Sequence, residues 1–176
     1  MKLVVVNGYP LSGKSLFVSY CLQHLGAYGQ EISTVEFIKK IATNLGWNGE
    51  KTPHTRKFLS DLKRLLTEWD DIPWKETLKV IDDFHAKFDV YDMPTDRAVM
   101  FIHSREPEEI SRFREELGAV SVLIRRASVS DNEQSNDSDA NVEDINYDYV
   151  IENDGTEEEL REKAHQFCEM ILNENK

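Results

Sequence analysis

The chain holds few of the residues that typify secreted or membrane proteins. Only two of its 176 residues are cysteines, Cys21 and Cys168. No disulfide framework is therefore expected, and both thiols are predicted to lie buried within helices in a reducing compartment. No apolar run approaches the roughly 20 residues that span a bilayer, and the apolar start after Lys2 is shorter than a signal-peptide core. We expect a cytoplasmic protein with no membrane partner.

Positive charge is also scarce. The chain carries 21 lysines and arginines against 33 aspartates and glutamates, which gives a formal net charge of −12. A nucleic-acid backbone or an anionic membrane would be repelled by such a chain, so neither is expected as its main partner. A small anionic ligand needs only a local positive pocket, and this composition does not exclude nucleotides. Oligomeric state is left open between monomer and homodimer.

One stretch carries the clearest chemical signal. Residues 8–15 match the phosphate-binding pattern G-x-x-x-x-G-K-[ST] at every fixed position. A β-branched run at 2–6 predicts a strand before the motif, and the apolar pattern from Leu16 to about Ala27 predicts a helix after it. In this arrangement, loop N–H groups and the positive end of the helix dipole converge on an anion. We predict that Lys14 reaches the β- and γ-phosphates of ATP and that the Ser15 hydroxyl binds Mg²⁺. The predicted ATP contacts of this stretch are Gly8, Tyr9, Pro10, Leu11, Ser12, Gly13, Lys14, Ser15 and Leu16.

Strand and helix patterns alternate along the rest of the chain. Further strands are predicted at 32–35, 98–102, 120–124 and 149–151. Helices are predicted over 36–45 and around 58–69, from Pro73, from Pro107, and from a capping box that begins at Thr156. The alternation predicts an α/β fold of the P-loop NTPase type, a three-layer sandwich with a five-stranded parallel sheet and helices on both faces. We expect a single domain over 1–176, with a helical insert at 36–90 and a flexible acidic lid loop at 127–146.

Several arginines follow predicted strands directly. Arg105 comes after the third strand, and Arg125 and Arg126 come after the fourth. Open parallel sheets bind ligands at the carboxyl ends of their strands, so these arginines are candidate phosphate ligands. Transfer of a phosphoryl group between two anionic molecules needs such positive charge. Arg56 opens a predicted helix among other basic residues, and its position alone indicates a solvated charge.

The acidic and histidine residues give weaker signals. No hydrophobic run ends in an aspartate that would hold Mg²⁺, and Asp92, Asp96 and Glu106 are equal candidates. The metal site beyond Ser15 is therefore open. His103 closes the third strand and is a candidate for contact with the site, whereas the spacing of the five histidines does not indicate zinc.

The stretch 128–146 is rich in serine, asparagine and acidic residues, and no lysine or arginine occurs from Ala127 to Leu160. One interpretation is a surface loop that is disordered in the free protein. Another is a lid that closes over phosphates. A third, weaker interpretation is a docking segment for a basic partner.

Taken together, the motif at the amino terminus, the helical insert and the arginines after the strands resemble the nucleoside monophosphate kinase group. The chain is most similar to the phage-type deoxynucleoside monophosphate kinases and their uncharacterised bacterial relatives. At position 103, where that family often carries an acid, this chain has histidine, and its lid stretch has no arginine. The stretches that carry the resemblance cover most of the chain; they are 7–15, 37–42 with 45–47, 55–59, 104–110, 146–151 and 153–156.

The resemblance implies roles by position. Arg56 and Arg105 would hold the acceptor monophosphate, and Arg125 or Arg126 would bridge donor and acceptor phosphates. The turn 153–156 would lie beside the donor base, which makes Asn153 and Gly155 predicted ATP contacts.

The predicted function is an ATP-dependent transfer of the γ-phosphate of Mg-ATP to a small phosphorylated acceptor, expected to be a (deoxy)nucleoside monophosphate. One alternative is a kinase for another small metabolite such as dephospho-coenzyme A. A second alternative is a regulatory module that binds a nucleotide without catalysis.

Overall fold

The strands of the protein form one sheet with the motif strand at its centre. The computed structural model describes residues 1–130, 142 and 145–173. Its sheet has the order β2-β3-β1-β4-β5, and the pairings of β1 with β3, of β1 with β4 and of β4 with β5 are parallel. The predicted α/β fold with a five-stranded parallel sheet is confirmed. The strands are β1 (Lys2–Asn7), β2 (Gly29–Ser33), β3 (Val99–His103), β4 (Val120–Arg125) and β5 (Tyr149–Glu152).

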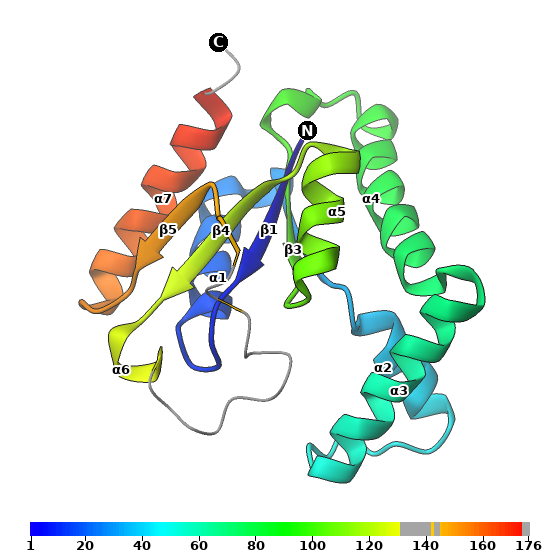
Figure 1. The fold of residues 1–176 in the computed structure, drawn as a ribbon. Helices are drawn as coiled ribbons and strands as arrows, with labels where there is room; N and C mark the ends of the chain where they lie inside the picture. Colours follow the sequence, from blue (N-terminus) through cyan, green and yellow to red (C-terminus); the bar gives the residue numbers. More distant parts are fainter. Residues whose placement is uncertain (131–141, 143–144, 174–176) are drawn as a thin grey trace. The chain divides into compact units, whose positions relative to one another are not determined.

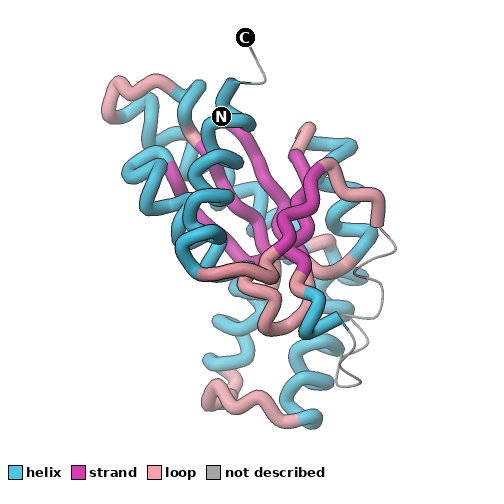
Figure 2. Tube along the Cα trace, turned by 90° about the vertical axis from the view of Figure 1, so that its left-hand side faces the viewer, coloured by secondary structure: helices cyan, strands magenta, loops and turns pink. Residues whose placement is uncertain are grey.

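Helices cover both faces of this sheet, as Figures 1 and 2 show. On one face lie α1 (Lys14–Leu25) and α7 (Glu157–Asn173), and on the other lies α5 (Pro107–Leu117), which buries Ile110 and Phe113. Because side chains alternate along a strand, every second residue of the central strands faces α1 and α7. These residues are Val4, Val6, Val99, Phe101, Val122 and Ile124, and they join Phe17, Phe167 and Ile171 of the two helices in one core.

The chain divides into two compact units. One comprises residues 1–31 and 93–176, and the other comprises residues 32–92. The second unit contains the helices expected between 36 and 90, namely α2 (Glu36–Asn44), α3 (Pro53–Asp70) and α4 (Ile72–Val90). The start of α3 differs most from the prediction, because the apolar pattern placed the helix around 58–69 and it begins at Pro53. Thr52 caps this start: its Oγ1 accepts from the Thr55 N–H at 3.1 Å. Such caps lie outside the apolar pattern from which the helix was predicted.

Two predicted segments differ from the structure. The second strand occupies Gly29–Ser33 and not 32–35, because Thr34 and Val35 form the turn into α2, with Val35 at its N-cap. The stretch from 128 onward was predicted as a loop, but Ala127–Ser130 form a short helix, α6. Residues 131–141 and 143–144 of the predicted lid lie outside the described residues.

The capping box at the start of α7 is confirmed, since the N–H of Thr156 donates to Glu159 Oε2 at 3.0 Å and the N–H of Glu159 donates to Thr156 Oγ1 at 3.2 Å. Short 3₁₀ turns at Gly26–Tyr28 and Thr95–Arg97 complete the chain's described elements.

The two cysteines lie inside the core between α1 and α7. Both are free thiols and both are buried, and burial raises the pKa of the Cys21 thiol. They therefore act as small apolar groups in packing. Across the described part of the chain, no helix combines the length and the apolar character needed to cross a membrane.

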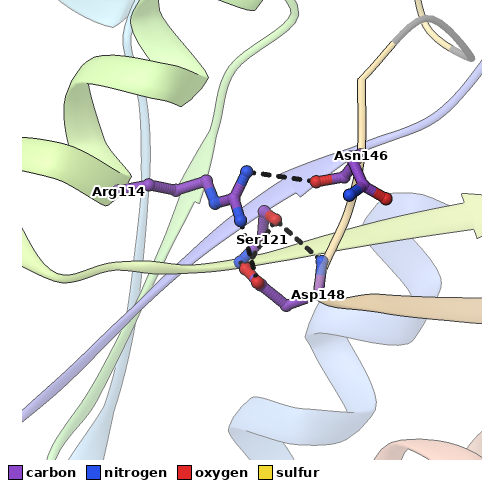
Figure 3. Close-up of polar contacts among 4 residues, drawn as sticks. All are labelled: Arg114, Ser121, Asn146 and Asp148. Atoms are coloured by element: carbon purple, nitrogen blue, oxygen red, sulfur yellow. Dashed lines mark hydrogen bonds and ion pairs between the residues drawn. The ribbon is translucent and has the colours of Figure 1, made fainter.

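A hydrogen-bonded cluster around Asp148 joins the start of β5 to β4 and α5 (Figure 3). Asp148 Oδ2 accepts from the N–H and the Oγ of Ser121, at 2.8 and 2.7 Å. Its Oδ1 accepts from Arg114 Nη2 at 2.9 Å, and Arg114 Nη1 donates to the Asn146 carbonyl at 3.1 Å. Burial alone would raise the pKa of Asp148, but the bonds from Ser121 and the charge of Arg114 outweigh burial and hold that pKa below its ordinary value.

Replacement Asp148→Asn should destabilise the protein near neutral pH, by about 1–2 kcal/mol once solvent screening is allowed for. Because the folded state depresses this pKa, the carboxylate stabilises the fold above the ordinary aspartate pKa of about 4, and the benefit is lost as pH falls through the folded-state pKa. The difference in unfolding free energy between variant and wild type should therefore shrink below about pH 4. Urea denaturation over a pH series measures it.

The matched control is Asp61→Asn, which removes an exposed ion pair between neighbours on α3, where Lys57 Nζ lies 2.8 Å from Asp61 Oδ2. It should change stability little at any pH. A pH-independent loss in Asp148→Asn would contradict the assignment of the stabilisation to the charged carboxylate.

Candidate functional site

The motif forms the turn that links β1 to α1 at the carboxyl end of the sheet. The N–H of Ser12 donates to the Tyr9 carbonyl at 3.2 Å, and the N–H of Phe17 donates to the Gly13 carbonyl at 2.9 Å, which starts the helix. Gly13 is the N-cap of α1. The positive end of a 12-residue helix thus faces the loop, which is the arrangement that binds anions.

Both glycines of the motif are required by their surroundings. Gly8 has φ +145°, and a Cβ there would lie 2.3 Å from the Ile124 carbonyl oxygen of β4. Gly13 has φ +96°, and a Cβ there would lie 2.3 Å from Asn153 Nδ2. Residues with a Cβ rarely adopt such φ values, and neither position has room for a Cβ. The loop backbone is therefore packed directly against the ends of β4 and β5.

Lys14 folds back over this loop. Its Nζ donates to the Gly8 carbonyl and to the Tyr9 carbonyl, the latter at 2.6 Å. Lys14 is half-buried, whereas Ser15, in the first turn of α1, is exposed. The ammonium is thus held by neutral acceptors over the place where the loop would receive an anion, and a phosphate oxygen is a stronger partner for it.

Inside the loop, the hydroxyl of Ser12 is fully buried and has no hydrogen-bond partner among the described residues. It lies over Gly8, because a Cβ at Gly8 would be 2.9 Å from Ser12 Oγ. A buried hydroxyl without a partner is costly, and a ligand oxygen in the loop would satisfy it. This orphaned atom fits the phosphate predicted for the loop.

Asn153 connects the end of β5 to the loop. Its side chain is buried and Nδ2 donates to the Ser12 carbonyl at 2.8 Å, while its N–H donates to the Arg125 carbonyl at 2.7 Å. The Asn153 amide thus supports the loop backbone. The sequence analysis predicted Asn153 beside the donor base and did not predict this contact with the loop. In the same turn, Asp154 Oδ1 accepts from the Ala127 N–H at 2.8 Å, and Gly155 lies against the carboxylate end of the exposed Glu159 side chain.

The predicted arginines fall at different places. Arg105 is exposed, two residues beyond β3, and Arg126 is exposed directly after β4. Arg125 is the last residue of β4, and its Nη1 lies 3.0 Å from Glu152 Oε1 at the end of β5. The parallel pairing brings the carboxyl ends of β3, β4 and β5 to the same edge of the sheet as the loop. Arg56 is exposed in the first turn of α3, in the other compact unit.

His103 and two of the three candidate acids, Asp96 and Glu106, lie near the ends of β3. His103 Nε2 lies 3.0 Å from Glu31 Oε2 of β2, so the histidine at the end of β3 has a carboxylate partner. Glu106 is the N-cap of α5, beside Arg105. Asp96 precedes β3 and so lies at the amino end of the sheet, away from the loop. Within the described residues, no group of three or more histidine, cysteine or acidic side chains is arranged to hold a metal ion.

Asn7 is a residue of this site that the sequence did not single out. It ends β1 and is fully buried, and its Oδ1 accepts from the Gly8 N–H at 2.8 Å. The available signal was a polar residue at the end of a run of three valines. A polar side chain at the end of a buried strand is itself buried, and a buried amide needs hydrogen-bond partners nearby.

No protein-family profile and no curated protein matches the sequence. Among solved structures, a sugar kinase from Janibacter sp. HTCC2649 is similar at 18% identity with a TM-score of 0.48, over 98% of this chain and 96% of that one. Shikimate kinase from Aquifex aeolicus vf5 is similar at 14% identity with a TM-score of 0.47, over 97% of this chain and 98% of that one. Those activities belong to the two proteins that carry them.

Replacement Gly13→Ala should destabilise the protein by about 2–4 kcal/mol, because it adds a steric clash with Asn153 to the strain of positive φ. Gly46→Ala is the matched control, since Gly46 has φ +100° but open space around the added Cβ. It should lose only the strain, about 1 kcal/mol. Equal losses in thermal or urea unfolding would show that Asn153 does not pack tightly on the loop.

Proposed function

We propose that this protein is an ATP-dependent phosphotransferase that moves the γ-phosphate of Mg-ATP to a small phosphorylated acceptor. The observation that carries the proposal is the loop itself. Its glycines admit no side chain, Lys14 is held over it, and the buried Ser12 hydroxyl has no partner among the described residues. Each of these features fits a bound phosphate chain.

In the proposed reaction, an oxygen of the acceptor attacks the γ-phosphorus of ATP. The bond from that phosphorus to the oxygen bridging the β- and γ-phosphates breaks, and ADP leaves with this oxygen. The protein has little covalent chemistry to perform, so catalysis depends on positioning and on positive charge around the γ-phosphoryl group. Lys14 would move from its carbonyl partners to the β- and γ-phosphates, and no side chain needs to act as a strong base.

The arginines supply the remaining charge in this proposal. Arg105, after β3, would bind the acceptor phosphate, and the resemblance assigns the same role to Arg56. Of the two arginines at the end of β4, Arg126 is exposed, whereas Arg125 is paired with Glu152 and would have to exchange that carboxylate for a phosphate. We therefore assign the bridging position between donor and acceptor to Arg126 first, with Arg125 as the supporting charge.

Mg²⁺ would be held by the Ser15 hydroxyl and by phosphate oxygens of ATP. Magnesium usually keeps several waters and needs few protein ligands when it binds through substrate phosphates. An exposed hydroxyl in the first turn of α1 therefore fits it, and the scarcity of carboxylates there does not conflict with it. When bound, the ion neutralises charge that develops on the phosphate oxygens. Asn153 and Gly155 would contact ATP from the turn after β5.

We propose a (deoxy)nucleoside monophosphate as the acceptor, on the strength of the resemblance and of Arg105, which lies two residues beyond β3 at the loop's edge of the sheet. Another phosphorylated metabolite would need the same arginine. Nucleotide binding without transfer is the competing outcome, and the pairing of Arg125 with Glu152 is the observation that favours it. An assay of ADP release distinguishes the three.

Replacement Lys14→Ala should lower acceptor-dependent ADP release by about 10²–10³-fold, because it removes the charge nearest the transferred group. The measurement is a coupled assay with Mg-ATP and a panel of ribo- and deoxynucleoside monophosphates. Lys2→Ala, at the other end of β1, is the control and should retain full turnover. Wild-type protein that binds ATP but releases no ADP with any acceptor would contradict the nucleotide-acceptor proposal.

Replacement Arg105→Ala should raise the KM for the acceptor and lower kcat, for a combined loss in kcat/KM of about 10²-fold or more. The Kd for Mg-ATP should stay within about twofold, since the residue is assigned to the acceptor. Arg112→Ala is the control, because Arg112 forms an ion pair within α5, with Nε 2.8 Å from Glu116 Oε1. If both variants behaved alike, Arg105 would be a surface charge only.

A further inference from the structure

A chain of hydrogen bonds leads from the phosphate loop to Tyr147, far away in the sequence. The buried amide of Asn7 uses both of its ends: Oδ1 accepts from the Gly8 N–H at 2.8 Å, and Nδ2 donates to Tyr147 Oη at 2.8 Å. Tyr147 Oη in turn donates to the carbonyl of Val142 at 2.8 Å. Val142 is fully buried, so the chain of hydrogen bonds ends on a carbonyl of a buried residue.

The direction of these bonds is determined at every step. The Gly8 N–H can only donate, so the Asn7 oxygen must face it and the Asn7 NH₂ group must face Tyr147. The Tyr147 hydroxyl has one proton, which it gives to the Val142 carbonyl, and so it accepts from Asn7. Reversing the Asn7 amide would set a donor against the Gly8 N–H and an acceptor against a hydroxyl that already uses its proton. Tyr147 therefore favours the same amide orientation that the Gly8 N–H requires.

Tyr147 is anchored to the sheet through Asp148, the next residue in the chain. Asp148, the next residue, accepts from the N–H and the Oγ of Ser121 in β4 and pairs with Arg114 of α5. The backbone at Tyr147 is thus fixed to the sheet independently of the phosphate loop. A residue anchored in this way can impose an orientation on Asn7 and does not merely follow it.

The bond to Asn7 matters because of what happens to Gly8 in the proposed reaction. In the structure the Gly8 carbonyl accepts from Lys14 Nζ, while the Gly8 N–H donates to Asn7 Oδ1. When a phosphate chain draws Lys14 away, the Gly8 carbonyl loses its partner and Asn7 remains the side chain that holds this peptide. Gly8 has φ +145° and no Cβ to restrict it, so a loop without this support would occupy more conformations and would bind phosphates less tightly.

We infer that Asn7 and Tyr147 are positioning residues for the nucleotide site, with Tyr147 acting on the loop through the Asn7 amide. The inference rests on the proposed function, because it concerns the affinity of the same loop for Mg-ATP. It adds to the binding machinery a pair of residues that lie outside the eight-residue motif. Neither residue is assigned a contact with the nucleotide.

The test is the affinity of full-length variants for Mg-ATP, measured by titration calorimetry together with their stability toward urea. Tyr147→Phe keeps the ring and removes the hydroxyl, and we expect the Kd to rise about three- to tenfold. Tyr20→Phe is the matched control. It also removes one tertiary hydrogen bond of a mostly buried tyrosine, from Tyr20 Oη to Glu157 between α1 and α7. The control should lose stability and keep the wild-type Kd.

The double variant separates positioning from a general structural role. Asn7→Ala should raise the Kd at least as much as Tyr147→Phe, and the combined variant should bind no more weakly than Asn7→Ala alone, because Tyr147 acts through Asn7. If Asn7→Ala fails to fold, the comparison of Tyr147→Phe with Tyr20→Phe decides the matter.

Two results would overturn the inference while leaving the proposed function intact. In the first, Tyr147→Phe loses stability as Tyr20→Phe does and binds Mg-ATP like the wild type. In the second, the losses in affinity from Asn7→Ala and Tyr147→Phe add in the double variant, which would mean that the two residues act separately. Wild-type protein that fails to bind Mg-ATP would instead overturn the proposed function, and the inference with it.

Discussion

The structure depends on the close approach of the loop backbone to the ends of its neighbouring strands. At Gly8 and Gly13, a single added carbon would lie 2.3 Å from the Ile124 carbonyl and from the Asn153 amide, respectively. Such packing requires β1 to lie inside the sheet, with β3 on one side and β4 on the other. It also requires β5 to end beside β4, in the register that pairs Arg125 with Glu152. The strand order thereby determines the shape of the proposed anion site.

Positive charge is gathered at this edge in a chain whose net charge is −12. The structure holds several of these cationic or polar groups with internal partners: Lys14 with two loop carbonyls, Arg125 with Glu152 and His103 with Glu31. Each partner keeps a side chain near the strand ends, where a multiply charged ligand would compete for it. Ligand affinity is then a difference between two sets of contacts, which is smaller than either set alone.

Much of the framework could be predicted from local patterns. The β-branched runs located β1, β3 and β4, prolines at the first turns located α4 and α5, and the capping box at Thr156 located the start of α7. The prediction of β2 was displaced toward Val35, because the apolar residues there continue into the turn and the N-cap of α2. Edge strands with few buried residues carry a weak alternation signal, and β2 has no fully buried position.

The amino-acid sequence by itself determined the glycine-rich loop, the α/β alternation and the arginines at or just beyond the ends of β3 and β4, because each depends on residues close together in the chain. Tertiary structure alone decided which side chains support the loop. Asn7 and Tyr147 are 140 positions apart, and Asn153 and Ser12 are 141 apart. Such pairs meet only after the strands have taken their order and register, and local periodicity does not encode which strand ends become neighbours.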